Sequence, residues 1–187
     1  MKFIKYLIFG LVLLLLLGGG VLLWKWQKAN NAEAETARVF QEQIKKANPE
    51  IYRQLIKTAD EARLKTEKDS KDFQSWMDLG VSSQNLGNKA EAEKAYKQAI
   101  RINRNSFVAW NNLASLYRDQ ADYPAARDSY LEIIKFAPSE TSAYLNLAEL
   151  YVAGKGGTIA DARAVLEQGL KVNPSPALKS ALDQLSN

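Results

Sequence analysis

The sequence predicts an all-α protein with an N-terminal transmembrane helix, a short α-solenoid of about three helix pairs and a C-terminal capping helix. Two observations support this fold class. The stretch from Tyr6 to Trp24 is strongly apolar and contains no charged residue. Between residues 73 and 174, aromatic and small residues recur at a step of 34 positions, within stretches that have the apolar spacing of amphipathic helices.

The first predicted element is a helix over residues 6–24. At roughly 1.5 Å per residue it is about 28 Å long, close to the roughly 30 Å hydrocarbon core of a bilayer. Tyr6, Trp24 and Trp26 lie at its two ends, where aromatic side chains favour the membrane interface. We therefore expect residues 1–28 to form a short tail and a signal-anchor helix.

Cleavage and orientation of this segment are less strongly specified. A cleaved signal peptide is the alternative to a retained anchor, but the apolar run continues through Leu23, beyond the small residues at 18–20. Lysines flank both ends, so flanking charge sets the orientation weakly. Because long C-terminal domains translocate largely regardless of charge, we expect a single-pass protein of the cell membrane with an extracytoplasmic repeat domain. A cytoplasmic repeat domain is the other possibility.

Residues 29–72 are expected to be a juxtamembrane helical segment. Asn48 followed by Pro49 has the pattern of a helix start, and Ile51 and Leu55 begin one apolar face of a helix over 49–66. This segment is either a degenerate fourth repeat or an N-terminal cap on the repeats that follow.

The repeat is clearest at a large aromatic position. Trp76, Trp110 and Tyr144 are separated by 34 residues each. The third unit keeps the pattern with its second half displaced by two, which indicates a two-residue insertion within 154–158. Other positions keep the 34-residue step: Leu79, Leu113 and Leu147; Ala92 and Ala126; Tyr96 and Tyr130. One such unit cannot bury its own apolar faces, so the units are expected to stack.

These stretches resemble the tetratricopeptide repeat. WMDLG, WNNLASLY and YLNLAELY match its first helix (helix A), and AEKAYKQAI, ARDSYLEII and ARAVLEQGL match its second (helix B). The resemblance implies a right-handed solenoid with repeats at 73–106, 107–140 and 141–174, and a cap at 175–187. Ser83, Arg104 and the insertion depart from the family pattern.

Composition excludes several classes of function. The 187 residues contain no cysteine and no histidine, which removes thiol nucleophiles, Cys or His metal sites and histidine acid–base chemistry. The net charge of +4 arises near the apolar segment rather than on the repeats, so we do not expect nucleic-acid binding. The glycine-rich loop at 154–158 lacks phosphate-loop spacing. We therefore expect no enzyme, no cofactor and no metal.

The resemblance implies a concave groove lined by helix A, which would hold a protein or an extended peptide segment. It assigns the following residues to that groove: Met77, Val81, Gln84, Asn111, Asn112, Ser115, Arg118, Asn146 and Glu149. Asn112 and Asn146 suit a peptide backbone because an amide both donates and accepts hydrogen bonds, although asparagine could also serve the fold there. Arg118 is the only basic residue of this set, so an acidic C-terminal chaperone tail is not the expected ligand.

The sequence and the resemblance together favour a bacterial, membrane-anchored scaffold for protein–protein interaction. By resemblance, such proteins act as assembly factors or ancillary chaperones for envelope complexes. The alternative is a structural role, in which the helices self-associate into a membrane-tethered homo-oligomer.

Overall fold

The computed structural model describes residues 24–25, 27–29 and 31–185, and the chain divides into two units, the first ending at Tyr52 and the second beginning at Arg53. The segment expected to cross the membrane, 6–24, lies outside the described residues except for Trp24. Within the described ranges, no helix has both the length and the apolar composition needed to span a bilayer.

The first unit contains a helix over residues 31–47. Arg38 forms an ion pair with Glu35 one turn earlier, at 2.8 Å. The helix ends at Asn48, whose side chain accepts a hydrogen bond from the backbone N–H of Ile51 at 3.1 Å and so caps the next helix. That helix, α2 (Pro49–Lys68), runs two residues further than the predicted 49–66 and crosses into the second unit.

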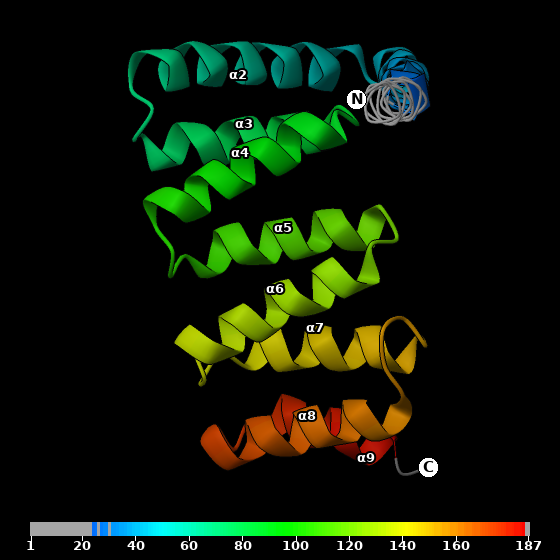
Figure 1. The fold of residues 1–187 in the computed structure, drawn as a ribbon, viewed down its shortest axis with the longest axis vertical. Helices are drawn as coiled ribbons and strands as arrows, with labels where there is room; N and C mark the ends of the chain where they lie inside the picture. Colours follow the sequence, from blue (N-terminus) through cyan, green and yellow to red (C-terminus); the bar gives the residue numbers. More distant parts are fainter. Residues whose placement is uncertain (1–23, 26, 30, 186–187) are drawn as a thin grey trace, which may run out of the picture. The chain divides into compact units, whose positions relative to one another are not determined.

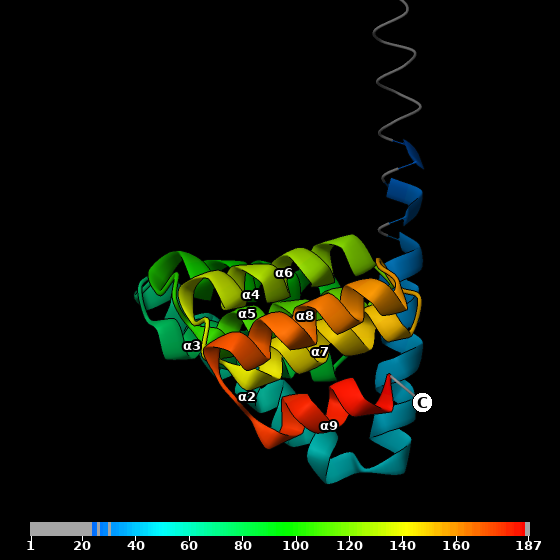
Figure 2. The ribbon, with the colours of Figure 1, turned by 90° about the horizontal axis from the view of Figure 1, so that it is seen from below.

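The second unit is a stack of antiparallel helix pairs (Figure 1). Figure 2 shows two layers, with α3, α5 and α7 in one and α4, α6 and α8 in the other. Every regular element in the described residues is an α-helix. After α2 the helices are α3 (Phe73–Asn85), α4 (Lys89–Ile102), α5 (Phe107–Asp119), α6 (Tyr123–Phe136), α7 (Thr141–Val152), α8 (Ile159–Val172) and α9 (Pro176–Gln184).

The turn between successive pairs is built in the same way each time. The side chains of Asp72, Ser106 and Glu140 precede α3, α5 and α7, and each accepts a hydrogen bond from a backbone N–H in the first turn of its helix. These positions are 34 residues apart. The same local signal therefore begins each helix A.

The turn within each pair depends on a left-handed residue. Gly87 ends the α3–α4 turn at φ 76°, and Ala121 occupies the equivalent place between α5 and α6 at φ 60°. Glycine adopts this conformation freely, whereas alanine is strained there. In the third pair the longer turn uses Gly154 at φ 68° and Gly156 at φ 89°.

The core lies between the two layers and continues from pair to pair. Ala92, Ala126 and Ala162 are fully buried, because helices A and B approach closely at these small residues. The last helix, α9, packs on α7 and α8 through the buried Leu178. A Cβ added at Gly169 would lie 2.9 Å from a methyl group of Leu178, so the glycine permits this close approach.

The repeated aromatic position is not buried equally. Tyr144 is 1% exposed, whereas Trp76 and Trp110 are partly exposed at the edges of their core clusters. Of the three rings, only that of Tyr144 is therefore fully enclosed in the core.

Candidate protein-interaction surface

A recurring hydrogen bond fixes each helix A against the preceding turn. The indole N–H of Trp76 donates to the carbonyl of Ser70, and that of Trp110 to the carbonyl of Arg104, both at 2.9 Å. The hydroxyl of Tyr144 donates to the carbonyl of Pro138 at 2.8 Å. In each case the acceptor is six residues earlier, so α3, α5 and α7 are held in equivalent positions and present equivalent faces.

We call the surface of α3, α5 and α7 formed by the predicted groove residues the helix-A face. Arg118 and Glu149 are exposed on it, and Val81 is 42% exposed. Met77 differs, because it is 5% exposed and belongs to the core cluster with Ala92, so its side chain does not lie at the surface. The remaining predicted residues are partly exposed: Gln84, Asn111, Asn112, Ser115 and Asn146.

Part of this polar set connects neighbouring repeats. Asn146 on α7 donates from Nδ2 to Oδ1 of Asn111 on α5 at 3.1 Å. Gln84 on α3 donates from Nε2 to Oδ2 of Asp119 on α5 at 3.3 Å, while its Oε1 accepts from the hydroxyl of Tyr96 at 2.8 Å. Both inter-repeat bonds join residues 35 positions apart. These side chains therefore set the spacing between adjacent A helices.

The rest of the polar set is available to a ligand. In the described part of the chain, the side chains of Asn112, Ser115, Arg118 and Glu149 make no hydrogen bond or ion pair. The charges of Arg118 and Glu149 both affect the pKa of the Tyr130 hydroxyl. Burial raises the pKa of Tyr130, the Arg118 charge lowers it and the Glu149 charge raises it. The cation Arg118 and the anion Glu149 thus come from adjacent repeats, and neither forms an ion pair within the described chain.

The sequence alone could not separate these two groups of residues. The 35-residue spacing of Gln84 and Asp119 and of Asn111 and Asn146 is a signal, because it joins one helix A to the next at nearly the repeat step. The structure shows that the carboxylate of Asp119 accepts the inter-repeat hydrogen bond from Gln84.

Comparison with family models matches the tetratricopeptide repeat at residues 77–141 and again at 111–168. Residues 77–168 carry tetratricopeptide repeats. Such repeats typically act as scaffolds for protein–protein interaction and are typically non-enzymatic. A comparison with curated proteins finds no match.

Several solved structures share the fold. A tetratricopeptide repeat protein from Parabacteroides merdae is 18% identical with a TM-score of 0.60, over 80% of this chain and 60% of its own. MamA is 17% identical with a TM-score of 0.56, over 68% of this chain and 74% of its own. The Naa15/Naa10 structure bound to HypK-THB gives 20% identity and a TM-score of 0.55, over 82% of this chain and 22% of that one. At these identities the likeness establishes the fold alone.

Proposed function

We propose that this protein is a membrane-anchored scaffold whose helix-A face binds a protein or an extended peptide segment. The main supporting observation is that the polar residues of that face fall into two groups, one that joins neighbouring repeats and one that is available to a ligand. Asn111 and Asn146 hold two repeats in register, while Asn112 and Arg118 on α5 have no protein partner in the described residues. An amide offers a donor and an acceptor to a peptide backbone, and a guanidinium adds a charge-assisted bond to a carboxylate.

Within this proposal, residues 6–24 anchor the chain in the cell membrane, with the repeats on the extracytoplasmic side. Support comes from the length and apolarity of the segment and from the absence of any charged residue in it. A scaffold fixed in this way would serve as an assembly factor or ancillary chaperone for an envelope complex. We expect the full chain to resist carbonate extraction from membranes and to be digested by protease added to the periplasmic side.

Binding is tested by affinity capture with the full-length protein in its native host. The variant Asn112→Ala/Arg118→Ala removes two unpaired groups from the helix-A face, and Lys179→Ala on the exposed surface of α9 is the matched control. We expect the double variant to remain folded and to lose a partner that the wild type and the control retain. Retention of every captured partner by the folded double variant would contradict the proposal.

A further inference from the structure

Two pockets of the repeat domain are at equivalent places, one between α2 and α4 over α3 and one between α4 and α6 over α5. We call these places the first and second gaps, and the equivalent place between α6 and α8 over α7 the third gap. The aromatic floor residues are Trp76, Trp110 and Tyr144, at the 34-residue step. Because the same positions line each gap, differences between gaps can be assigned to individual substitutions.

The first gap is closed by an ion pair. Arg63 on α2 reaches Glu91 on α4, with Nη2 at 2.9 Å and Nε at 3.1 Å from the same carboxylate oxygen. The hydroxyl of Ser83 donates to the other oxygen of Glu91 at 2.9 Å. The pocket that remains has a volume of about 230 Å³.

The third gap is closed by apolar packing. Tyr144 and Leu147 form its floor and are 1% and 0% exposed. Tyr151, which occupies the place of Tyr117 in the second gap, is 8% exposed. Val165 on α8 packs against the same core cluster.

The second gap is closed neither by an ion pair between its two walls nor by apolar packing. Ala125 stands 34 residues after Glu91, so α6 offers no carboxylate there, and Lys97 pairs instead with Glu93 on its own helix. The result is a pocket of about 460 Å³ with an apolar floor that includes Trp110 and Leu113. This volume is within the range of about 300–1,000 Å³ that ligand pockets occupy.

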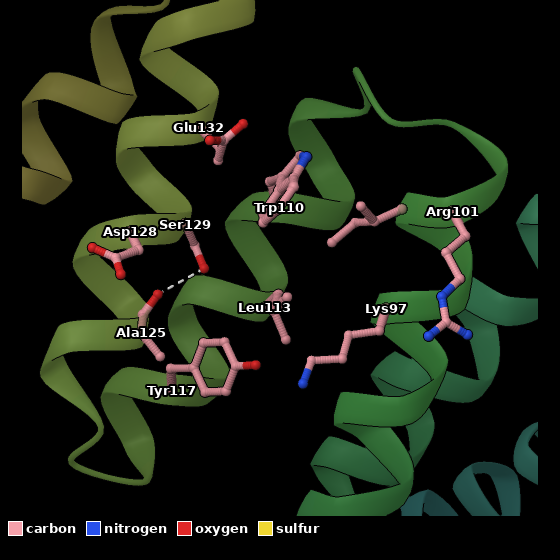
Figure 3. A pocket seen from close by; sticks show the side chains of 10 residues that line it. Lys97, Arg101, Trp110, Leu113, Tyr117, Ala125, Asp128, Ser129 and Glu132 are labelled. Carbon is pink, nitrogen blue, oxygen red and sulfur yellow. Dashed lines mark hydrogen bonds between the residues drawn. The ribbon is translucent and has the colours of Figure 1, made fainter.

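The walls of the second gap carry opposite charge. Figure 3 shows Lys97 and Arg101 on one side and Asp128 and Glu132 on the other, with Trp110 between them. Over the described ranges, Arg101 has no carboxylate partner.

Among the described residues, the two acidic residues of this gap form ion pairs with residues of α6 itself. Asp128 lies 2.7 Å from Arg127, and Glu132 lies 3.5 Å from Lys135. Such exposed pairs are weak and exchange readily for a ligand's charges.

We propose that the gap between α4 and α6 is a second docking site, which holds a short segment of a partner protein. One apolar side chain of the segment fills the floor over Trp110 and Leu113. An acidic side chain beside it pairs with Arg101, and a basic side chain on the other flank pairs with Glu132. A purely apolar occupant would leave the positive charge of Arg101 without a partner. A segment with an acidic and a basic side chain on either side of its apolar anchor complements the charges of both walls.

The test uses a displayed library of random peptides, selected on the immobilised full chain. The variant Lys97→Arg/Ala125→Glu places an arginine and a glutamate at the positions equivalent to Arg63 and Glu91. It should close the second gap with the same ion pair that closes the first. The variant Arg101→Glu reverses the charge at one position on the basic wall. The variant Lys179→Glu on α9 makes the same change of charge elsewhere and is the control. Circular dichroism establishes that each variant is folded before binding is measured.

We expect selected peptides to share one apolar anchor with an acidic neighbour. Their affinity should fall at least ten-fold on the closed variant, remain unchanged on Lys179→Glu, and shift toward peptides with a basic neighbour on Arg101→Glu. No enrichment, or equal affinity for the wild type and the closed variant, would overturn the proposal.

Two further outcomes also overturn it, and each identifies another occupant or site. Peptides that lose affinity only on Asn112→Ala/Arg118→Ala would bind the helix-A face, which would leave the proposed function intact. A wild-type dimer in light scattering that the closed variant abolishes would identify a second copy of this chain as the occupant.

Discussion

The side-chain amide of Asn146 donates a hydrogen bond to the side-chain oxygen of Asn111, 3.1 Å away on the neighbouring helix A. This bond joins α5 and α7 on the face where the proposed ligand binds. Asn112, the next residue on α5, has no such bond in the described residues. The two adjacent asparagines therefore have different roles. Asn111 sets the spacing of the repeats, and Asn112 is available to bind a ligand.

The Asn111–Asn146 bond should be measurable as a coupling. We expect a double-mutant cycle with Asn111→Ala and Asn146→Ala to give an interaction free energy of about 0.5–1.5 kcal/mol in denaturant unfolding, the usual net value of a hydrogen bond. Asn112→Ala is the control and should change stability by no more than about 0.5 kcal/mol. Strict additivity of the two single substitutions would contradict the structural role.

Burial of Tyr144 predicts a graded response to substitution. Tyr144→Phe keeps the ring but removes the bond to the carbonyl of Pro138, and should cost about 0.5–1.5 kcal/mol. Tyr144→Ala also empties the core and should cost about 3–5 kcal/mol. Trp110→Ala should cost less than Tyr144→Ala, because Trp110 is partly exposed. Equal losses at the two positions in thermal or denaturant unfolding would contradict the difference in burial.

Ala121 is a site where a smaller residue should stabilise the protein. Its φ of 60° costs an alanine about 1–2 kcal/mol, and glycine relieves this strain at some cost in the entropy of the unfolded chain. We expect Ala121→Gly to raise stability by about 0.5–1 kcal/mol. The same replacement at Ala164, exposed in the middle of α8, should lower stability by about 1 kcal/mol. A loss at both positions would argue against the left-handed turn.

Buried tyrosines predict an alkaline limit to stability. Burial raises the pKa of Tyr96 and of Tyr130 above the ordinary value of about 10, because the charged phenolate is poorly solvated in the core. A raised pKa means that this stability is complete below about pH 10 and is lost as pH rises above it. We expect a melting temperature that is steady from about pH 7 to pH 9 and falls above about pH 10.

Tyr130→Phe removes one of these groups and provides the comparison. Its melting temperature should fall less steeply above about pH 10 than that of the wild type, whatever its value at neutral pH. Parallel curves for the two proteins would show that Tyr130 does not contribute to the alkaline transition.

Much of the fold could be predicted because its signals are local and repeated. The 34-residue step of Trp76, Trp110 and Tyr144 predicts the helix pairs, and Pro49 after Asn48 predicts the start of α2. Contacts between distant parts of the chain were less predictable. Arg63 on α2 pairs with Glu91 on α4, 28 residues later, and no local pattern in the sequence indicates this contact.

The candidate site was predictable only in outline. Helical spacing predicts which residues share the face of helix A, but it does not indicate how deeply each side chain is buried. Met77 follows the predicted spacing and is buried, because it packs against the neighbouring helix pair. The open gap between α4 and α6 depends on Ala125 in place of a carboxylate, a substitution whose effect appears only when the helices are packed.

Site-specific photo-crosslinking of the full-length protein in native membranes tests the central claim most directly. A photoreactive residue at Ser115 reports on the helix-A face, one at Arg101 on the gap between α4 and α6, and one at Lys179 on the exposed surface of α9. The scaffold account predicts a discrete protein adduct from Ser115, identifiable by mass spectrometry, and none from Lys179. Adducts from Arg101 or Lys179, with none from Ser115, would contradict recognition through the helix-A face.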